Sequence, residues 1–341
     1  MEVRTGSPVM WGLHNDALKE ELVEQGFVSI GWDELGDLHR LKGGRDGIKA
    51  ELARHHPDDS SGRINTQAGV IYRFAHSIKP GDLVVAPYKP DSTINIGRIT
   101  GEYYFQPDAA VHCHRRSVQW LRTGLSRNEF SQSALYELGS AITLFRVRRH
   151  EQEILDVLGG KPIISPTQYA TTGASEEATP EMPTAARIEQ ATMDFVLEAI
   201  SKKITPAEFE ELTADVLRAL GYRARVTPYS QDGGVDVIAH KDPLGIEPPQ
   251  IMVQCKQRIG SVTAPDVQQL VGAGWGSLLL YVTTGSFTKD ALAIERQNAS
   301  LRLLSGSDFV GLVIAHYVKL PEKWQKLIPL RPVLAVDAAS E

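Results

Sequence analysis

Three residues in the C-terminal half of this 341-residue chain have types and a spacing suited to metal-assisted chemistry on a phosphodiester. Asp236 follows the glycine pair of SQDGGVDVIAH, and Gln254 and Lys256 lie two apart in QIMVQCKQR. Alternate side chains of a strand share a face, so Gln254 and Lys256 point one way and Cys255 the other. If the strand after Asp236 pairs with this one as in a hairpin, the acid comes to lie beside both polar side chains.

These groups can activate a water molecule with the help of a divalent cation. A carboxylate, an amide oxygen and the backbone carbonyl of Cys255 are hard oxygen ligands suited to Mg²⁺. A bound metal lowers the pKa of water and polarises a phosphate, and Lys256 can stabilise the developing negative charge. Glu210, beside the apolar stripe of a predicted helix, can reach the same metal directly or through water. The alternative is that Asp236 belongs to a turn and Lys256 is a solvated strand end.

The surrounding segments predict an α/β fold around a mixed sheet. Thr205-Pro206-Ala207-Glu208 has the form of a capping box, and apolar residues then recur with a period of about 3.6 until Gly221. The run SLLLYVTT is continuously apolar at its start, which is typical of a strand covered on both faces. The expected helices begin at Thr205 and cover 262–271 and 289–299, and the expected strands cover 235–239, 251–256 and 277–284.

Composition agrees with an ordinary globular protein, with 42% hydrophobic and 23% charged residues. No apolar run approaches the roughly 20 residues that span a bilayer, and the N-terminus lacks a signal-peptide core. We therefore expect a cytoplasmic protein without a membrane segment. The net charge of −6 lowers the expectation of nucleic-acid binding, although a local basic groove can lie on an acidic protein. Two cysteines outside any CxxC pair predict neither a disulfide scaffold nor structural zinc.

A stretch rich in Gly, Pro, Ser, Thr and Ala divides the chain and reads as a linker. The predicted organisation is an N-terminal recognition domain over 1–158, a linker over 159–187, a catalytic domain over 188–330 and a tail over 331–341. Short strands separated by tight turns predict that the N-terminal domain is α+β and contains a small barrel.

The segment 205–317 resembles the Mrr-type catalytic domain of restriction endonucleases, within the PD-(D/E)xK nuclease superfamily. FEELTADVLRALGY, QDGGVDVIA, IMVQCKQR and LLLYVTTGSFTKDA carry the resemblance in that order. It implies that Asp236, Gln254 and Lys256 hold the metal-binding and catalytic positions, with Glu210 as the helical acid. Mrr-like members share the glutamine, whereas the wider superfamily more often has an acid there. The missing negative charge implies weaker metal binding.

Three hydroxyl side chains follow the predicted central strand. Thr283, Thr284 and Ser286 are interpreted either as phosphate contacts or as parts of a strand end and helix cap.

The order WGLHND, GFVSIGWDEL, GDLVVAPY, INIGRITGEYYF and RRSVQW, over about 8–150, is similar to PUA-like domains of the EVE type. In restriction systems such domains read modified bases, so the resemblance implies a pocket for an extruded base. We assign Trp11, Asn15, Asp16, Trp32 and Tyr88 to that pocket. For the aromatic residues the alternative is a core position, and for Asn15 and Asp16 it is a helix cap.

Two further groups in this half are weaker candidates. His112-Cys113-His114 lacks the other ligands of a zinc site. The arginines are interpreted either as phosphate contacts or as an ordinary solvated face, namely Arg115, Arg116, Arg148 and Arg149.

Together these features predict a modification-dependent DNA endonuclease of the type IV restriction kind. Its N-terminal domain would read a modified base in double-stranded DNA, and its C-terminal domain would cut with Mg²⁺ or Mn²⁺. We expect a homodimer, because cutting both strands usually needs two active sites. One alternative is an inactive reader of modified DNA or RNA, which the neutral Gln254 keeps open. The other is a nuclease specific for branched DNA junctions.

Overall fold

The computed structural model describes residues 8–15, 17–18, 20–88, 92–140, 142–160, 185–227, 234–242, 247, 249–273 and 277–333. Its contacts divide the chain into two units, Met1–Thr123 with Tyr136–Ala178 and Gly124–Leu135 with Thr179–Glu341. Gly124–Leu135 therefore belongs to the second unit, although the sequence analysis placed it inside the N-terminal domain. Most of the predicted linker 159–187 and of the tail 331–341 lies outside the described residues.

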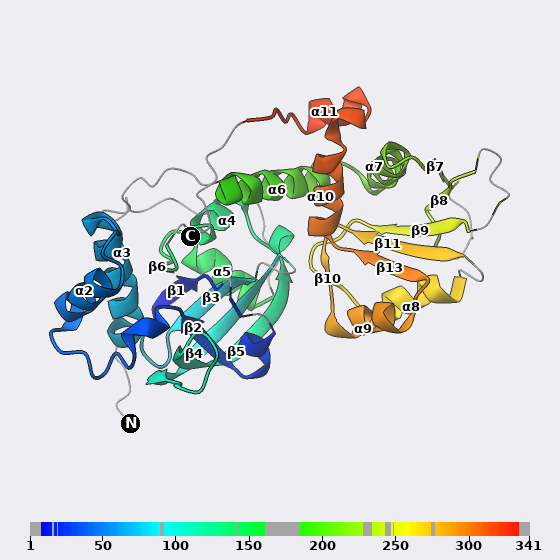
Figure 1. The fold of residues 1–341 in the computed structure, drawn as a ribbon. Coiled ribbons are helices and arrows are strands. Elements are labelled where there is room, and N and C mark those ends of the chain that lie inside the picture. Colours follow the sequence, from blue (N-terminus) through cyan, green and yellow to red (C-terminus); the bar gives the residue numbers. More distant parts are fainter. Residues whose placement is uncertain are drawn as a thin grey trace. The chain divides into compact units, whose positions relative to one another are not determined.

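The first unit contains a sheet and several short helices (Figure 1). The strands are β1 (Met10–Leu13), β2 (Phe27–Ile30), β3 (Leu83–Tyr88), β4 (Thr93–Phe105), β5 (His114–Ser126) and β6 (Leu144–Arg146). The helices are α1 (Glu21–Glu24), α2 (Gly44–His55), α3 (Ser61–Tyr72), α4 (Gln132–Leu138) and α5 (Glu151–Leu158), of which α4 crosses the boundary between the units.

The sheet of the first unit has the strand order β2-β5-β4-β3-β1-β6. β3 pairs in antiparallel with β4 and in parallel with β1. The described part of this unit mixes helices with a mixed sheet, in agreement with the α+β prediction. However, β2 and β6 are the edges of the sheet, and no pairing between them is found among the described strands. The closed small barrel expected from the sequence is therefore not confirmed.

Apolar residues of the helices and strands form one core in the first unit. Ile48 and Leu52 of α2 are 1% and 0% exposed, and Ile71 and Phe74 are fully buried as α3 ends. They share this core with Trp11 of β1. An amphipathic pair of helices thus buries its apolar stripe against the sheet.

The second unit contains η4 (Arg127–Glu129), a single 3-10 turn, and the elements of the C-terminal half (Figure 1). The helices are α6 (Ala185–Lys202), α7 (Pro206–Ala219), α8 (Ala264–Ala273), α9 (Lys289–Gln297), α10 (Gly306–Ala315) and α11 (Glu322–Leu327). The strands are β7 (Arg223–Val226), β8 (Val237–His240), β9 (Ile251–Lys256), β10 (Ser261–Val262), β11 (Leu278–Thr283), β12 (Ser286–Phe287) and β13 (Leu301–Leu304).

Its main sheet has the order β13-β11-β9-β8-β7, and a separate small sheet joins β10 and β12. β9, β11 and β13 are parallel, whereas β7, β8 and β9 pair in antiparallel. Apolar residues of α6, α7, α10 and α11 form one core with the sheet, and those of α8 and α9 form another. The α/β fold with a mixed, two-sided sheet agrees with the prediction. None of the described helices is long and apolar enough to cross a membrane.

Candidate functional site

Helix α7 carries Glu210, and local sequence fixes where this helix starts. The Thr205 hydroxyl accepts a hydrogen bond from the backbone N–H of Glu208 (3.3 Å), and the Glu208 carboxylate accepts one from the backbone N–H of Thr205 (2.8 Å). Pro206 occupies the first turn, where no N–H is needed. Phe209 and Leu212 are fully buried, so the helix is fixed in rotation as well as in position.

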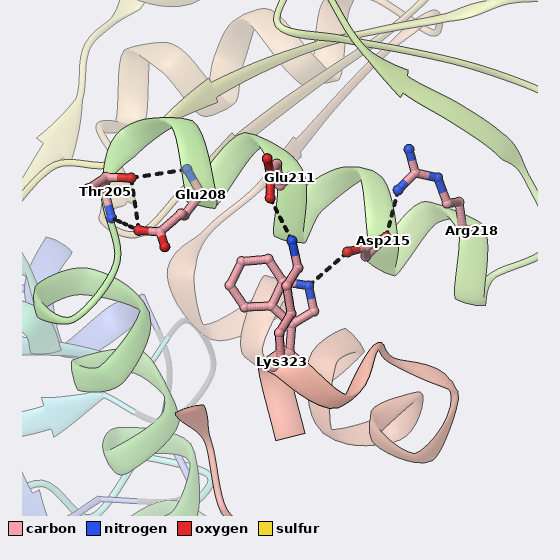
Figure 2. A network of polar contacts seen from close by, with 7 residues as sticks. Thr205, Glu208, Glu211, Asp215, Arg218 and Lys323 are labelled. Carbon is pink, nitrogen blue, oxygen red and sulfur yellow. Dashed lines mark hydrogen bonds and ion pairs between the residues drawn. The ribbon is translucent and has the colours of Figure 1, made fainter. Parts of the chain in front are cut away.

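Two acids further along α7, Glu211 and Asp215, form polar contacts with α11, as Figure 2 shows. Lys323 forms an ion pair with Glu211, and the indole N–H of Trp324 donates to Asp215 (2.8 Å). Arg218 also pairs with Asp215. These contacts hold α7 from the side of α11, which leaves Glu210 as the acid of this helix that interacts with Asp236.

Asp236 lies directly before β8 and is held against β9. The strands pair in antiparallel with Val237 opposite Val253, as the hairpin hypothesis expected. The backbone N–H of Asp236 donates to the carbonyl of Val253 (2.8 Å). The carboxylate in turn accepts a hydrogen bond from the backbone N–H of Cys255 (2.7 Å). Asp236 is therefore fixed beside the middle of Gln254-Cys255-Lys256.

Electrostatics connect Asp236 with Glu210 and Lys256. Burial raises the pKa of Asp236, while the Cys255 N–H and the Lys256 ammonium act in the opposite direction. Burial also raises the pKa of Glu210, and the negative charge of Asp236 raises it further. Two partly desolvated carboxylates that repel each other form a place where a cation is favoured.

Gln254 supplies the observation that tests this site for a metal. Its side-chain oxygen is buried and accepts no hydrogen bond from the described residues. A buried acceptor without a donor is costly, and a cation can satisfy it. The backbone at Gly234 lies close to the Gln254 side chain. Its φ is 88°, and a Cβ atom at this position would lie 3.0 Å from the Gln254 amide nitrogen. An amide oxygen and carboxylates are ligand types that an oxygen-preferring divalent ion takes.

Sites built from other ligand types are not seen in the described residues. No group of three or more His, Cys, Asp and Glu side chains gathers there. The sulfur of Cys255 instead forms a hydrogen bond with Thr213 of α7, and burial raises the pKa of this thiol. Its side chain packs with the core that α7 shares with the sheet. Only the backbone of Cys255 thus remains a candidate ligand.

Lys256 is exposed at the end of β9, and two threonines at the end of β11 hold the backbone of Lys256 and of the turn after it. The Thr283 hydroxyl donates to the carbonyl of Lys256 (2.8 Å), and the Thr284 hydroxyl donates to that of Arg258 (2.9 Å). The Ser286 hydroxyl donates to the carbonyl of Gly124 (3.1 Å). These buried hydroxyls support the strand-end alternative rather than phosphate contacts.

A narrow pocket lies in the first unit, and the space within it together with the open solvent at its mouth is about 320 Å³. Two residues assigned from sequence, Asn15 and Tyr88, line it. Trp120, Ser29 and Asn95 line it as well and were not foreseen. Its other walls are apolar, from Leu13, Leu22, Val28, Ala86 and Pro87. The alternation of polar and apolar residues around Trp120 indicates a strand, which is the signal that could have placed Trp120 on the sheet.

Trp11 and Trp32, which the sequence analysis assigned to a base pocket, do not line this one. Trp11 is 6% exposed and belongs to the core, where its indole N–H donates to the buried Asp82 carboxylate (3.1 Å). Trp32 packs against the same core and does not line the pocket. Asp16 lies outside the described residues. Asn15 lines the pocket, and its side-chain oxygen accepts from the N–H groups of Ala17 and Leu18 in a local turn. It is not the helix cap that the alternative expected, because α1 begins only at Glu21 and its N-cap is Glu20.

Two of the four arginines assigned to phosphate are committed to other partners. Arg116 is fully buried, and its guanidinium donates to the carbonyls of Phe74 (2.7 Å) and Ala75 (2.8 Å). This correction follows from burial, because a phosphate cannot reach it. Arg115 lies over the Phe27 ring, with 4.1 Å between the guanidinium carbon and the ring centroid.

Arg148 and Arg149 are exposed and stay candidates for phosphate contacts. Their backbone N–H groups donate to the carboxylate of Glu137. His114 of β5 uses both ring nitrogens, on the Tyr103 hydroxyl (2.9 Å) and the Trp32 carbonyl (3.0 Å).

Comparison with known proteins assigns a class to the region that holds Asp236. Residues 201–313 match the family model of the Mrr catalytic domain, described as a restriction endonuclease. This range contains Glu210, Gln254 and Lys256. Residues 10–141 match a family model described only as a domain of unknown function, so the PUA-like resemblance is not confirmed.

Individual relatives agree with that class. The chain is 29% identical over 148 residues to the type IV methyl-directed restriction enzyme EcoKMrr of Escherichia coli (strain K12), covering 41% of this chain and 48% of the relative. It thus spans about half the length of that protein.

Two solved structures are also similar, each at 17% identity and a TM-score of 0.33. They are the DNA modification-dependent restriction endonuclease AspBHI, with 80% of this chain and 75% of that chain covered, and the MspJI restriction endonuclease in complex with a 27-mer oligonucleotide, with 84% and 69% covered. At this TM-score the two structures do not assign a role to any residue of this chain.

Proposed function

We propose that this protein is a modification-dependent DNA endonuclease that hydrolyses phosphodiester bonds with Mg²⁺ or Mn²⁺. The observation that carries the proposal is the grouping of Asp236 and Glu210 with the unpartnered amide oxygen of Gln254, next to Lys256. This grouping lies inside the segment that matches a restriction endonuclease model. The homology to a methyl-directed enzyme supports a modified-DNA substrate.

In this proposal the cation would be held by Asp236, Glu210, the Gln254 amide oxygen and the Cys255 carbonyl. The cation supplies a water of lowered pKa and polarises the phosphate when it is bound. Asp236 is prevented from rotating away by the Cys255 N–H. Lys256 donates its ammonium hydrogens to the attacking oxygen or to the phosphate oxygens, where negative charge accumulates.

The pocket of the first unit is the proposed reader of the modified base. Trp120 presents a fixed aromatic wall, because its indole N–H donates to the carbonyl of Leu22 (2.8 Å). Tyr88 supplies a second aromatic side chain and Asn95 an amide. An extruded base needs both stacking surfaces and polar groups that read its edge. Apolar walls suit a methyl-sized addition to that base.

We propose double-stranded DNA as the substrate and a homodimer as the cutting form, since one site cuts one strand. The exposed Arg148 and Arg149 are the proposed phosphate contacts of the first unit. Such contacts position DNA without reading its sequence.

The test is a cleavage panel with purified wild-type protein, Mg²⁺ or Mn²⁺, and plasmids that carry different methylated bases or none. We expect metal-dependent cutting of at least one modified plasmid and little cutting of unmodified DNA. Lys256→Ala should lose this activity and keep its affinity for DNA, while Lys289→Ala, an exposed lysine of the same unit, should match wild type.

Two other outcomes select the alternatives. Binding of modified DNA without cutting of any substrate would identify an inactive reader, which the neutral Gln254 side chain would explain. Cutting of branched DNA regardless of modification would identify a junction nuclease. Equal cleavage by wild type and Lys256→Ala would remove the assignment of this site.

A further inference from the structure

We infer that Asn128, from the N-terminal half of the chain, is a positioning residue for Lys256. It acts on the turn of residues 257–260, which directly follows Lys256. The inference rests on the proposed function and adds a residue outside the segment that matches the nuclease family model, which begins at 201.

Asn128 is 7% exposed and uses its side chain entirely on that turn and on the segment beside it. Its amide N–H groups donate to the carbonyls of Thr284 (2.8 Å) and Arg258 (3.0 Å). Its amide oxygen accepts from the backbone N–H of Gly260 (3.4 Å). One buried side chain therefore joins the turn after β9 to the end of β11.

The same turn is linked directly to Lys256. The backbone N–H of Thr284 donates to the Lys256 carbonyl (3.3 Å), and the Thr284 hydroxyl accepts from the Arg258 N–H (3.0 Å). Gln257 donates to the carbonyls of Ile200 and Ile204, each at 2.8 Å. The turn thus sets the end of β9 and also touches the loop that leads into α7, which carries Glu210.

The segment that delivers Asn128 is firmly held within the second unit. Arg127 of η4 forms a bidentate ion pair with Asp194 of α6, at distances of 2.6 and 2.7 Å. Their side chains are 6% and 5% exposed. Ser126 and Glu129 form a capping box around η4. Bidentate, buried pairing fixes geometry as well as charge. Asn128 consequently has little freedom to shift away from the turn.

Removing the amide would take the Asn128 donor from the buried Thr284 carbonyl, and it would leave the Arg258 carbonyl with the Thr284 hydroxyl as donor. A buried polar group without a partner drives local rearrangement, and here the rearranging backbone continues into Lys256. A displacement of about 1 Å of a catalytic group can reduce a rate by as much as ~10²-fold. We therefore expect the substitution to affect the chemical step more than DNA binding.

The experiment compares full-length wild type, Asn128→Ala and Asn128→Asp under single-turnover conditions on the modified plasmid that wild type cuts best. Asn128→Asp keeps the size of the side chain but loses both donated hydrogen bonds. Asn298→Ala is the matched control, because Asn298 holds an exposed turn after α9 by accepting from the Ser300 N–H. We expect both Asn128 variants to lower the cleavage rate constant by ~10-fold or more. DNA affinity and the active fraction should stay within about 2-fold, and Asn298→Ala should match wild type.

Amide hydrogen exchange provides a readout without cleavage. Exchange at Arg258 and Gly260 should accelerate in the Asn128 variants and not in Asn298→Ala. A wild-type rate constant in both Asn128 variants overturns the inference. So does a loss confined to the active fraction, which is what a merely structural role produces. Absence of cleavage by wild type itself would instead mean that the proposed function is wrong, and the inference would fall with it.

Discussion

The candidate cutting site and the candidate reading pocket differ in how their residues come together in the fold. Asp236, Gln254 and Lys256 lie on two antiparallel neighbours, so strand register alone brings them together. The pocket is lined from β1 through β5, and Tyr88 and Trp120 come from strands that are not neighbours in the sheet order. Residues joined by local register can be found by spacing, whereas a pocket assembled from distant strands cannot.

The two regions also differ in charge. The candidate cutting site gathers carboxylates whose pKa values are raised by burial, and under the proposed function a cation would complete it. The pocket is lined by aromatic, aliphatic and amide side chains. Substitutions should therefore separate catalysis from recognition, and four predictions test this in decreasing order of effect.

The largest effect is expected at Asp236. Asp236→Asn keeps the side-chain shape but removes a charged ligand, so cleavage should fall by at least ~10³-fold, corresponding to several kcal/mol of metal-dependent stabilisation. Binding of modified DNA should change little. Single-turnover cleavage and filter binding measure the two quantities. A parallel loss of both would contradict the separation of the two regions.

A smaller, selective effect is expected at Trp120. Trp120→Ala removes a stacking wall worth ~1–3 kcal/mol, so the preference for modified over unmodified DNA should fall by about 5- to 150-fold. Competition binding with matched duplexes measures this preference. Trp32→Phe is the control, because Trp32 does not line the pocket. Equal loss in both variants would mean that general damage to the unit, rather than stacking, is responsible.

An effect on stability is expected at Glu137, whose carboxylate holds the backbone of residues 148–150. Its carboxylate accepts from the N–H groups of Arg148, Arg149 and His150, and although burial opposes ionisation, these hydrogen bonds lower its pKa. The stabilisation is present above the unfolded pKa and is lost as pH falls through the folded value. Glu137→Gln should cost ~1–3 kcal/mol at pH 7 and less in acid.

Chemical denaturation at neutral and acidic pH measures this difference. Arg148→Ala and Arg149→Ala are the controls, because Glu137 binds their backbones and not their side chains. They should retain stability and, as proposed phosphate contacts, reduce the salt dependence of DNA binding. A stability loss in these controls as large as that of Glu137→Gln would contradict this division of roles.

The smallest effect is a gain of stability in the metal-free protein at neutral pH. Burial first, and then the charge of Asp236, raises the pKa of Glu210. A carboxyl group whose pKa is raised by folding contributes stability below its unfolded pKa, and this contribution is lost as pH rises through its folded pKa. Glu210→Gln should thus raise the melting temperature in chelator at pH 7.5, and this gain should vanish near pH 4. Added Mg²⁺ should stabilise wild type more than the variant.

Much of the second unit could be predicted because its signals are local. The capping box at Thr205 and the apolar period after it give α7, and the run 251–256 coincides with β9. Trp11 and Arg116 show the limit in the first unit. Their residue types suit base stacking and phosphate binding, and only long-range packing shows that one hydrogen-bonds the buried Asp82 and the other the carbonyls of Phe74 and Ala75.

The sequence by itself determined which groups the candidate site contains, since spacing on adjacent strands fixes which of their residues meet. Tertiary structure alone decided that Gly124–Leu135 belongs to the second unit and that Asn128 holds the turn after Lys256. No periodicity or motif marks such a contact. It forms because the buried carbonyl of Thr284, far away in the sequence, needs a donor that only the folded chain brings to it.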